Sequence, residues 1–229
     1  MNTEAVISVL VFLLVMAAII SEKVHRSVAA MAGAVILLLF HVLSIEEATS
    51  YVDINTIGVL VGMMLFVAVV KNSGLFEYVA IKAAKLTKGR PMAIMVVFAV
   101  ITALLSAFLD NVTTVLLIGP MTIAITQMLE VNPIPYLLSQ IMASNIGGTA
   151  TLIGDPPNIM IGSAAGLSFV DFVINTGSVI VIIMAVTVVI YYFMYRSRIS
   201  VVKENMQKVM ELDEDRSIKD KPLLIKSVI

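Results

Sequence analysis

The chain has 229 residues, of which 59% are hydrophobic and only 14% charged, and its mean hydropathy is +1.02. Soluble domains are about 45–50% apolar and about 25% charged, so this composition excludes an ordinary soluble domain and predicts a polytopic membrane protein. The net charge is −1 and there is no cysteine, which excludes disulfides and thiolate metal sites. No nucleic-acid partner is expected.

Three apolar segments open the chain, at residues 5–20, 27–43 and 54–70. Basic residues follow the first and third segments, and acidic residues follow the second. Because basic loops stay cytoplasmic, we expect these spans to run out-to-in, in-to-out and out-to-in, with the N-terminus outside. A cleaved secretory signal is not expected, since Lys23 and Arg26 follow the first run and no basic residue precedes it.

The next two segments differ in character. Residues 74–90 mix apolar and basic side chains at helical spacing, which predicts a helix lying in the cytoplasmic membrane interface; an ordinary solvated loop helix is the simpler alternative. Residues 91–128 are apolar on both sides of Asp110 and Asn111. The two arms would just span the membrane, or would form a hairpin that dips in and returns, and in either case the chain leaves on the side it entered.

Residues 136–166 are apolar but contain paired glycines and paired prolines. Lipid cannot hydrogen-bond to a broken backbone, so such a segment persists only inside protein or beside a cavity, as at transporter binding sites. We therefore predict two half-helices joined by an unwound stretch at 147–158; a kinked packing helix is the alternative. A last span at 172–195 ends in tyrosines and arginines, and 196–229 reads as a cytoplasmic linker followed by the start of another span.

Two carboxylates fall within the membrane. No Lys or Arg occurs between Arg90 and Arg196, and the acids in that interval are Asp110, Glu130, Asp155 and Asp171. Glu130 and Asp171 lie at predicted ends of spans, which leaves Asp110 and Asp155. A charge at membrane depth costs at least ~2.5–3.5 kcal/mol, so retaining two without a basic partner indicates coupling to a cation or proton.

The residues around these carboxylates are candidate ligands. Carboxylate, amide and hydroxyl oxygens at the tip between the two arms suit a hard cation, so Na⁺ at Asp110 and Asn111 is expected, although both could simply cap the second arm. Glycines permit close backbone approach, prolines leave carbonyls free, and a helix start after Asn158 would face an anion. The candidates are Ser106, Asp110, Asn111, Thr113, Gly147, Gly148, Thr149, Asp155, Pro156, Pro157 and Asn158.

The sequence SNIGGTATLIGDPPN at 144–158, preceded by DNVTT at 110–114, resembles the ion transporter superfamily. The nearest branch is that of arsenite permeases, sodium–proton antiporters and P-protein-like permeases; divalent anion:sodium symporters are more distant. The resemblance adds Asn145 to the candidate ligands. It implies an all-α fold that is one half of an inverted-repeat transporter, with five spans, an interfacial helix, a re-entrant hairpin at 91–128 and a broken helix at 136–166.

The same resemblance implies a transport domain at 1–195, a prokaryotic inner membrane, no cofactor other than the coupling ion, and a partner. That partner is a second repeat half, missing here, or a second copy in a homodimer. The symporter branch has hydroxyls where this chain has Asp110 and Asp155, which favours proton- or Na⁺-coupled antiport or efflux of a small inorganic ion or oxyanion such as arsenite or Na⁺.

Three alternatives remain beside this interpretation. One is a dicarboxylate- or citrate-type symporter half, and another is a truncated membrane subunit that does not transport. The third is an intramembrane aspartyl protease, but residue 152 is Leu where that signature has Gly, so we expect no enzyme.

Overall fold

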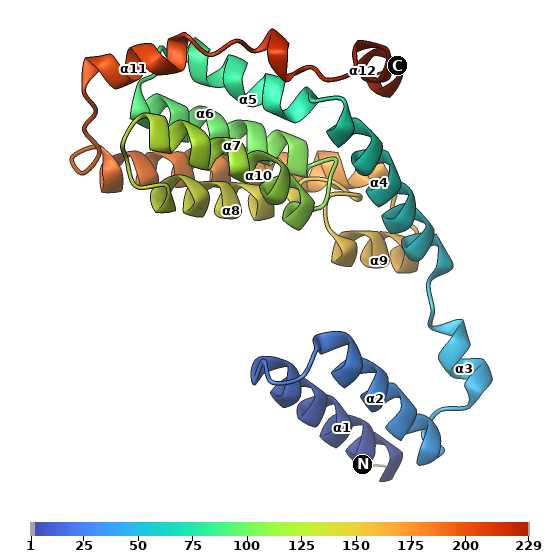
Figure 1. Ribbon diagram of the computed structural model, residues 1–229. Helices are drawn as coiled ribbons and strands as arrows, with labels where there is room; N and C mark the ends of the chain where they lie inside the picture. Colours follow the sequence, from blue (N-terminus) through green and yellow to red (C-terminus); the bar gives the residue numbers. More distant parts are fainter. Residues whose placement is uncertain (1–2, 229) are drawn as a thin grey trace. The chain divides into compact units, whose positions relative to one another are not determined.

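The computed structural model describes residues 3–228, and helices are its regular structure, with no strand in that range (Figure 1). The predicted all-α fold is therefore confirmed. The chain divides near Ile54 into two compact units, each described here by itself.

The first unit contains a pair of helices and a short third one: α1 (Thr3–Ile20), α2 (Arg26–Leu39) and α3 (Ile45–Ser50). α1 and α2 pack closely, because a Cβ on Gly33 would lie only 2.5 Å from Cγ2 of Val15. The apolar run to residue 43 predicts a longer α2 than the structure has. The helix stops at Leu39 because His41 takes a left-handed backbone conformation, with φ of 53°.

α3 is a helix that the sequence analysis missed. Ser44 and Glu47 form a capping box: the Ser44 hydroxyl accepts from the Glu47 amide at 3.1 Å, and the Glu47 carboxylate accepts from the Ser44 amide at 2.8 Å. Both bonds satisfy amides that have no partner at a helix start. The Ser-x-x-Glu spacing was a usable signal for this helix.

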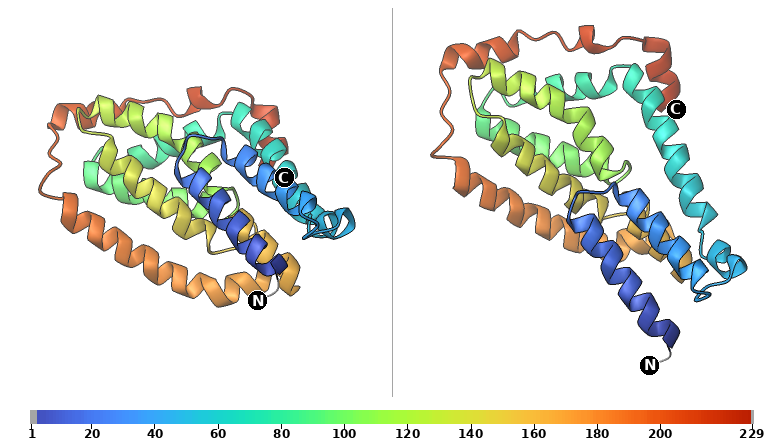
Figure 2. Two further views of the ribbon diagram at one scale, coloured as in Figure 1. Left: turned by 90° about the horizontal axis from the view of Figure 1, so that it is seen from below. Right: turned by 60° about the horizontal axis from the view of Figure 1, so that its bottom comes forward.

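The second unit contains the remaining helices. They are α4 (Ile54–Asn72), α5 (Leu75–Leu86), α6 (Pro91–Ser106), α7 (Asn111–Met128), α8 (Ile134–Gly148), α9 (Pro156–Ala165), α10 (Phe169–Tyr195), α11 (Lys203–Met210), a 3₁₀ turn (Asp215–Ser217) and α12 (Lys221–Val228). Helices α6, α7 and α8 lie against one another, and α10 runs along α6 and α8 (Figure 2). Ile229, the last residue of the predicted further span, lies outside the described residues.

The core of this unit joins α5 to the three packed helices. Its largest buried side chains come from α6, α7 and α8, and they include Phe98, Ile125 and Tyr136. Ala83 and Ala84 of α5 are buried in the same cluster. The apolar face of α5 therefore packs on protein, and its lysines lie on the remaining surface. Whether α5 also lies in a membrane interface stays a prediction.

Four described helices are long and apolar enough to cross a membrane: α1, α4, α7 and α10. α10 has 27 residues and no buried side chain, so its apolar surface is available to lipid. α2 has only 14 residues, or about 21 Å of helix, less than the ~30 Å hydrocarbon core. The count of five spans, the re-entrant hairpin and the inverted repeat stay predictions.

The last span begins earlier than predicted. The sequence predicts a start at residue 172, after Asp171, but α10 begins at Phe169. Ser168 and Asp171 form a capping box, so the acidic residue belongs to the first helical turn.

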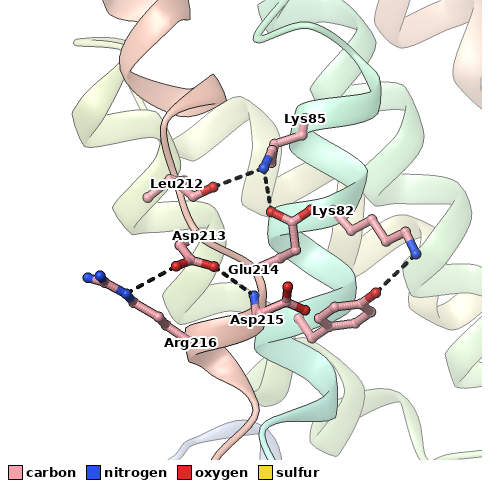
Figure 3. A network of polar contacts seen from close by, with 8 residues as sticks. Lys82, Lys85, Leu212, Asp213, Glu214, Asp215 and Arg216 are labelled. Atoms are coloured by element: carbon pink, nitrogen blue, oxygen red, sulfur yellow. Dashed lines mark hydrogen bonds and ion pairs between the residues drawn. The ribbon is translucent and has the colours of Figure 1, made fainter.

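Residues 203–219, here called the C-terminal strap, lie along α5 (Figures 1 and 3). Lys85 of α5 forms an ion pair with Glu214 and donates to the Leu212 carbonyl at 3.1 Å. Lys219 pairs with Glu77 at 3.3 Å. The approach is close at Gly74, where φ is 85° and a Cβ would lie 1.8 Å from the carbonyl oxygen of Ser217. Part of the predicted linker is thus packed against the helical unit.

Candidate functional site

The tip between α6 and α7 is ordered by Asp110. This residue is the N-cap of α7, and its Oδ1 accepts a hydrogen bond from the Thr113 amide at 2.9 Å. The Thr114 hydroxyl donates to the Asp110 carbonyl at 3.0 Å. Asp110 therefore does cap the second arm, as the simpler alternative held. The cap engages one carboxylate oxygen, so it does not exclude ion binding by the other.

The break in the second apolar segment is shorter than predicted. α8 continues through Gly147 and Gly148, and α9 already begins at Pro156, so the unwound loop comprises residues 149–155. The reason is that glycines at a helix end still accept and donate backbone bonds, and that prolines suit the first helical positions, where the missing N–H costs nothing. The predicted helix start after Asn158 was wrong.

Asn158 closes the loop from inside α9. Its side-chain amide donates to the Gly148 carbonyl at 3.1 Å and to the Thr151 carbonyl at 2.9 Å. These bonds satisfy carbonyls that a broken helix leaves without partners. The amide nitrogen is thereby committed to structure, and the side-chain oxygen is the part that a ligand could use.

Two glycines allow the hairpin and the broken helix to meet. A Cβ on Gly147 would lie 2.0 Å from the Ala103 carbonyl oxygen. A Cβ on Gly154 would lie 2.5 Å from the Gly148 carbonyl oxygen and 2.7 Å from that of Ser106. All three obstacles are backbone atoms, which cannot rotate away, so the C-terminal end of α6 and both sides of the break are in direct contact.

Polar side chains connect the same elements. The Ser106 hydroxyl donates to the Ser144 carbonyl at 2.8 Å, and the Asn111 amide donates to the side-chain oxygen of Asn145 at 2.9 Å. A cavity of about 250 Å³ lies beside them. Its lining consists of Asn111, Val112, Val115, Leu116, Ile141, Ser144 and Asn145.

Asp110 and Asp155 follow the two backbone segments that meet at this contact, and both residues are half-buried. No group of three or more His, Cys, Asp or Glu side chains that could hold a metal ion occurs in residues 3–228. A cation bound here would therefore be held by Asp110 and Asp155 together with neutral amide, hydroxyl and carbonyl oxygens.

The predicted site residues differ in how they take part. Thr113 contributes its backbone amide to the cap, and Thr149 is exposed, with its hydroxyl bonded to the Asn145 carbonyl of its own helix. Pro156 and Pro157 form the first positions of α9 rather than part of the unwound loop. The candidates where the hairpin tip meets α8 are Ser106, Asp110, Asn111, Asn145, Gly147 and Gly148, whereas Asp155 and Asn158 lie at the start of α9.

The comparison with protein families can now be set against this geometry. The family model described as Citrate transporter matches residues 16–229. The chain belongs to the citrate transporter family. The description of this family and the names of the relatives given below indicate transporters rather than enzymes.

Proteins similar to the chain include a 46 kDa membrane protein of Mycobacterium leprae, 40% identical over 226 residues that make up 97% of this chain and 53% of that protein. An uncharacterized transporter of Mycobacterium bovis is 39% identical over 226 residues, 97% of this chain and 52% of its own length. The human P protein is 40% identical over 181 residues, 75% of this chain and 22% of that protein. The chain spans about half the length of the mycobacterial relatives.

Two further residues of this citrate transporter family member contact the break but were not predicted. Thr151 donates from its hydroxyl to the Ala107 carbonyl and accepts from the Gly154 amide at 3.2 Å. Thr176 of α10 donates to the Ala150 carbonyl at 3.1 Å and to its own helix at Phe172. A hydroxyl inside a broken segment was a usable signal for Thr151. Thr176 carries no such signal, because most hydroxyls in spans bond only to their own helix.

Proposed function

We propose that this chain forms one half of a secondary active transporter that moves a small inorganic ion or oxyanion by alternating access, coupled to a proton or Na⁺ gradient. The observation that carries the proposal is the placement of Asp110 and Asp155, which follow the two backbone segments that meet where the hairpin tip contacts the broken helix. The sequence supplies no Lys or Arg between residues 90 and 196 to neutralise them. Like charges at this depth are stable only when a cation or proton is bound.

The residues divide into two roles in this proposal. Asp110, Asn111 and Thr113 at the tip bind the coupling ion, together with carbonyl oxygens of residues 147–149. Asp155 and the side-chain oxygen of Asn158 complete the same ion site or contact the substrate. The support is that Asn158 already places its amide on the Gly148 and Thr151 carbonyls, which fixes its oxygen beside the break.

The proposal includes a membrane setting and a partner. The N-terminus lies outside and residues 196–229 lie in the cytoplasm, as the distribution of basic residues favours. The site is completed by a second repeat half or by a second copy of this chain. The length of the mycobacterial relatives, about twice that of this chain, supports the first of these.

Transport by the complete gene product in proteoliposomes tests the assignment. We expect Asp110→Asn to abolish proton- or Na⁺-driven flux while membrane insertion stays intact, because the ion loses its charged ligand. Glu130→Gln is the matched control, since Glu130 is exposed at a loop outside the site. Normal flux in Asp110→Asn would refute the role of this carboxylate, and absence of ion-driven flux in the wild type would favour a non-transporting subunit.

Citrate is a second candidate substrate, favoured by the description of the family that the chain belongs to. A citrate anion would meet two carboxylates in this site, so its binding requires a cation or proton to offset the repulsion. Citrate uptake that stops when the coupling cation is withdrawn would support this candidate. Arsenite- or Na⁺-dependent flux without any effect of citrate would support antiport or efflux instead.

A further inference from the structure

We propose that Thr151 is the positioning residue of the ion site: its hydroxyl fixes the place of Asp155 relative to Asp110. This inference rests on the proposed function, because it concerns the two carboxylates that the proposal assigns to ion binding. Thr151 itself is assigned no contact with the ion.

The hydroxyl of Thr151 joins the two backbone segments that carry Asp110 and Asp155. It donates to the carbonyl of Ala107, three residues before Asp110, and it accepts from the amide of Gly154, immediately before Asp155. The residue is only 5% exposed, so water does not compete for either bond. One oxygen atom thus links the end of the hairpin to the end of the unwound loop.

Both backbone groups need such a partner. Ala107 is the C-cap of α6, and carbonyls at a helix end have no backbone N–H donor within the helix. Gly154 lies in the loop before α9, so its amide has no carbonyl acceptor within a helix. A hydroxyl can donate one bond and accept another at the same time. A side chain without a hydroxyl would leave the buried Gly154 amide and the half-buried Ala107 carbonyl without these partners.

The other side-chain hydrogen bonds at the site do not join the loop to the tip. Ser106 and Asn111 bond to Ser144 and Asn145, which belong to α8 before the break. Asn158 joins the loop to α8 and α9 but not to the hairpin. Among the described residues, Thr151 makes the one side-chain hydrogen bond between the hairpin and the loop itself.

The distance between two like charges sets how strongly each opposes ionisation of the other and how strongly a cation binds between them. Loss of the Thr151 bonds releases the backbone beside Asp155 and should weaken ion binding more than it slows the transport cycle. The expected signature is a change in the ion concentration for half-maximal flux, together with a shifted pH profile, at similar maximal flux.

The test compares Thr151→Val, which removes the hydroxyl at constant shape, with Thr151→Ser, which keeps it. Thr102→Val is the matched control, because Thr102 is fully buried and its hydroxyl bonds only to Phe98 of its own helix. We expect Thr151→Val to raise the ion concentration for half-maximal flux about tenfold, the size of one buried hydrogen bond. Thr151→Ser should restore the wild-type value, and Thr102→Val should leave it unchanged.

An ion dependence of Thr151→Val equal to that of the wild type, or no rescue by Thr151→Ser, would overturn the inference. Deuterium exchange of residues 149–158 in the full chain is a second measurement that does not depend on transport. Thr151→Val should make this exchange faster, and Thr151→Ser should not. If the wild type shows no ion-driven flux but this exchange pattern holds, the proposed function fails and the positioning contact stands. Equal exchange in Thr151→Val and Thr151→Ser would show that the Thr151 hydroxyl does not hold the loop. Should Thr151→Val not give monodisperse protein, Thr151→Ala takes its place in both measurements.

Discussion

The second unit is held together by polar contacts in two places, and the two use different chemistry. At the hairpin tip and the break, hydroxyls and amides bond to backbone carbonyls, and the described contacts include no ion pair. Between α5 and the C-terminal strap, the contacts are ion pairs: Lys85 pairs with Glu214 (Figure 3), and Lys219 pairs with Glu77. Both arrangements join segments far apart in the sequence.

This difference matches the charged-residue content of the two regions. Residues 91–195 contain no Lys or Arg, whereas residues 71–90 and 196–221 are rich in charges of both signs. Neutral partners satisfy broken backbone at membrane depth without the cost of burying charge. Ion pairs between half-exposed side chains work in water but contribute little stability. Among the described residues, Asp110 and Asp155 accordingly take part in no ion pair.

Substitution of Gly147 by Ala should have the largest effect. The added Cβ would lie 2.0 Å from the Ala103 carbonyl oxygen, so α6 and α8 must separate. Overpacking of this kind costs about 1–3 kcal/mol or more, and here the obstacle is backbone. Thermal unfolding of the detergent-solubilised protein measures the loss. Gly58→Ala is the control, because nothing lies within 4 Å of a Cβ there; equal stability of the two variants would contradict the close approach.

Replacement of Asn158 by Asp should come next. The two oxygens of Asp cannot donate, so the Gly148 and Thr151 carbonyls lose their partners and face a negative charge. Each unsatisfied buried group costs about 1–3 kcal/mol. Deuterium exchange of residues 149–158 should rise, while that of the strap stays constant. Unchanged exchange in Asn158→Asp would mean that the amide does not close the loop.

The ion pairs of the strap should give the smallest and most condition-dependent effect. The Lys85 side chain bonds to Glu214 and lowers the pKa of that carboxyl below its ordinary 4.5. Because the pKa of Glu214 is lower in the docked strap, the pair stabilises the docked strap at pH values above the ordinary pKa. This stabilisation is lost as the pH falls through the lowered pKa. Deuterium exchange of residues 203–219 should therefore rise in acid below pH 4.5.

Salt and charge removal separate this contact from the hydroxyl bonds at the break. Salt at about 1 M shortens the Debye length to about 3 Å and should loosen the strap, while residues 149–155 exchange as before. Lys85→Met should reduce the salt effect on the strap to the part that comes from Lys219 and Glu77. A strap that stays equally protected at every salt concentration would show that packing rather than charge holds it.

The sequence predicts the broken helix and its two carboxylates, because the residues that indicate them are close together in the chain. Paired glycines, paired prolines and the absence of basic residues predicted the break and its carboxylates. The ends of the break were misplaced because Gly148 and Pro156 are compatible with helix ends as well as with loops. The contacts of Thr151 and Thr176 depend on which carbonyls the packed helices bring near, and no spacing rule within one segment contains that information.

The cap made by Asp110 has a thermodynamic consequence. Its Oδ1 holds the first turn of α7 through the Thr113 amide, and an ionised carboxylate accepts that bond more strongly than a protonated one. A substitution at Asp110 therefore also changes the stability of the first turn of α7, which loses its cap. The first turn of α7 and the proposed ion site thus share one side chain.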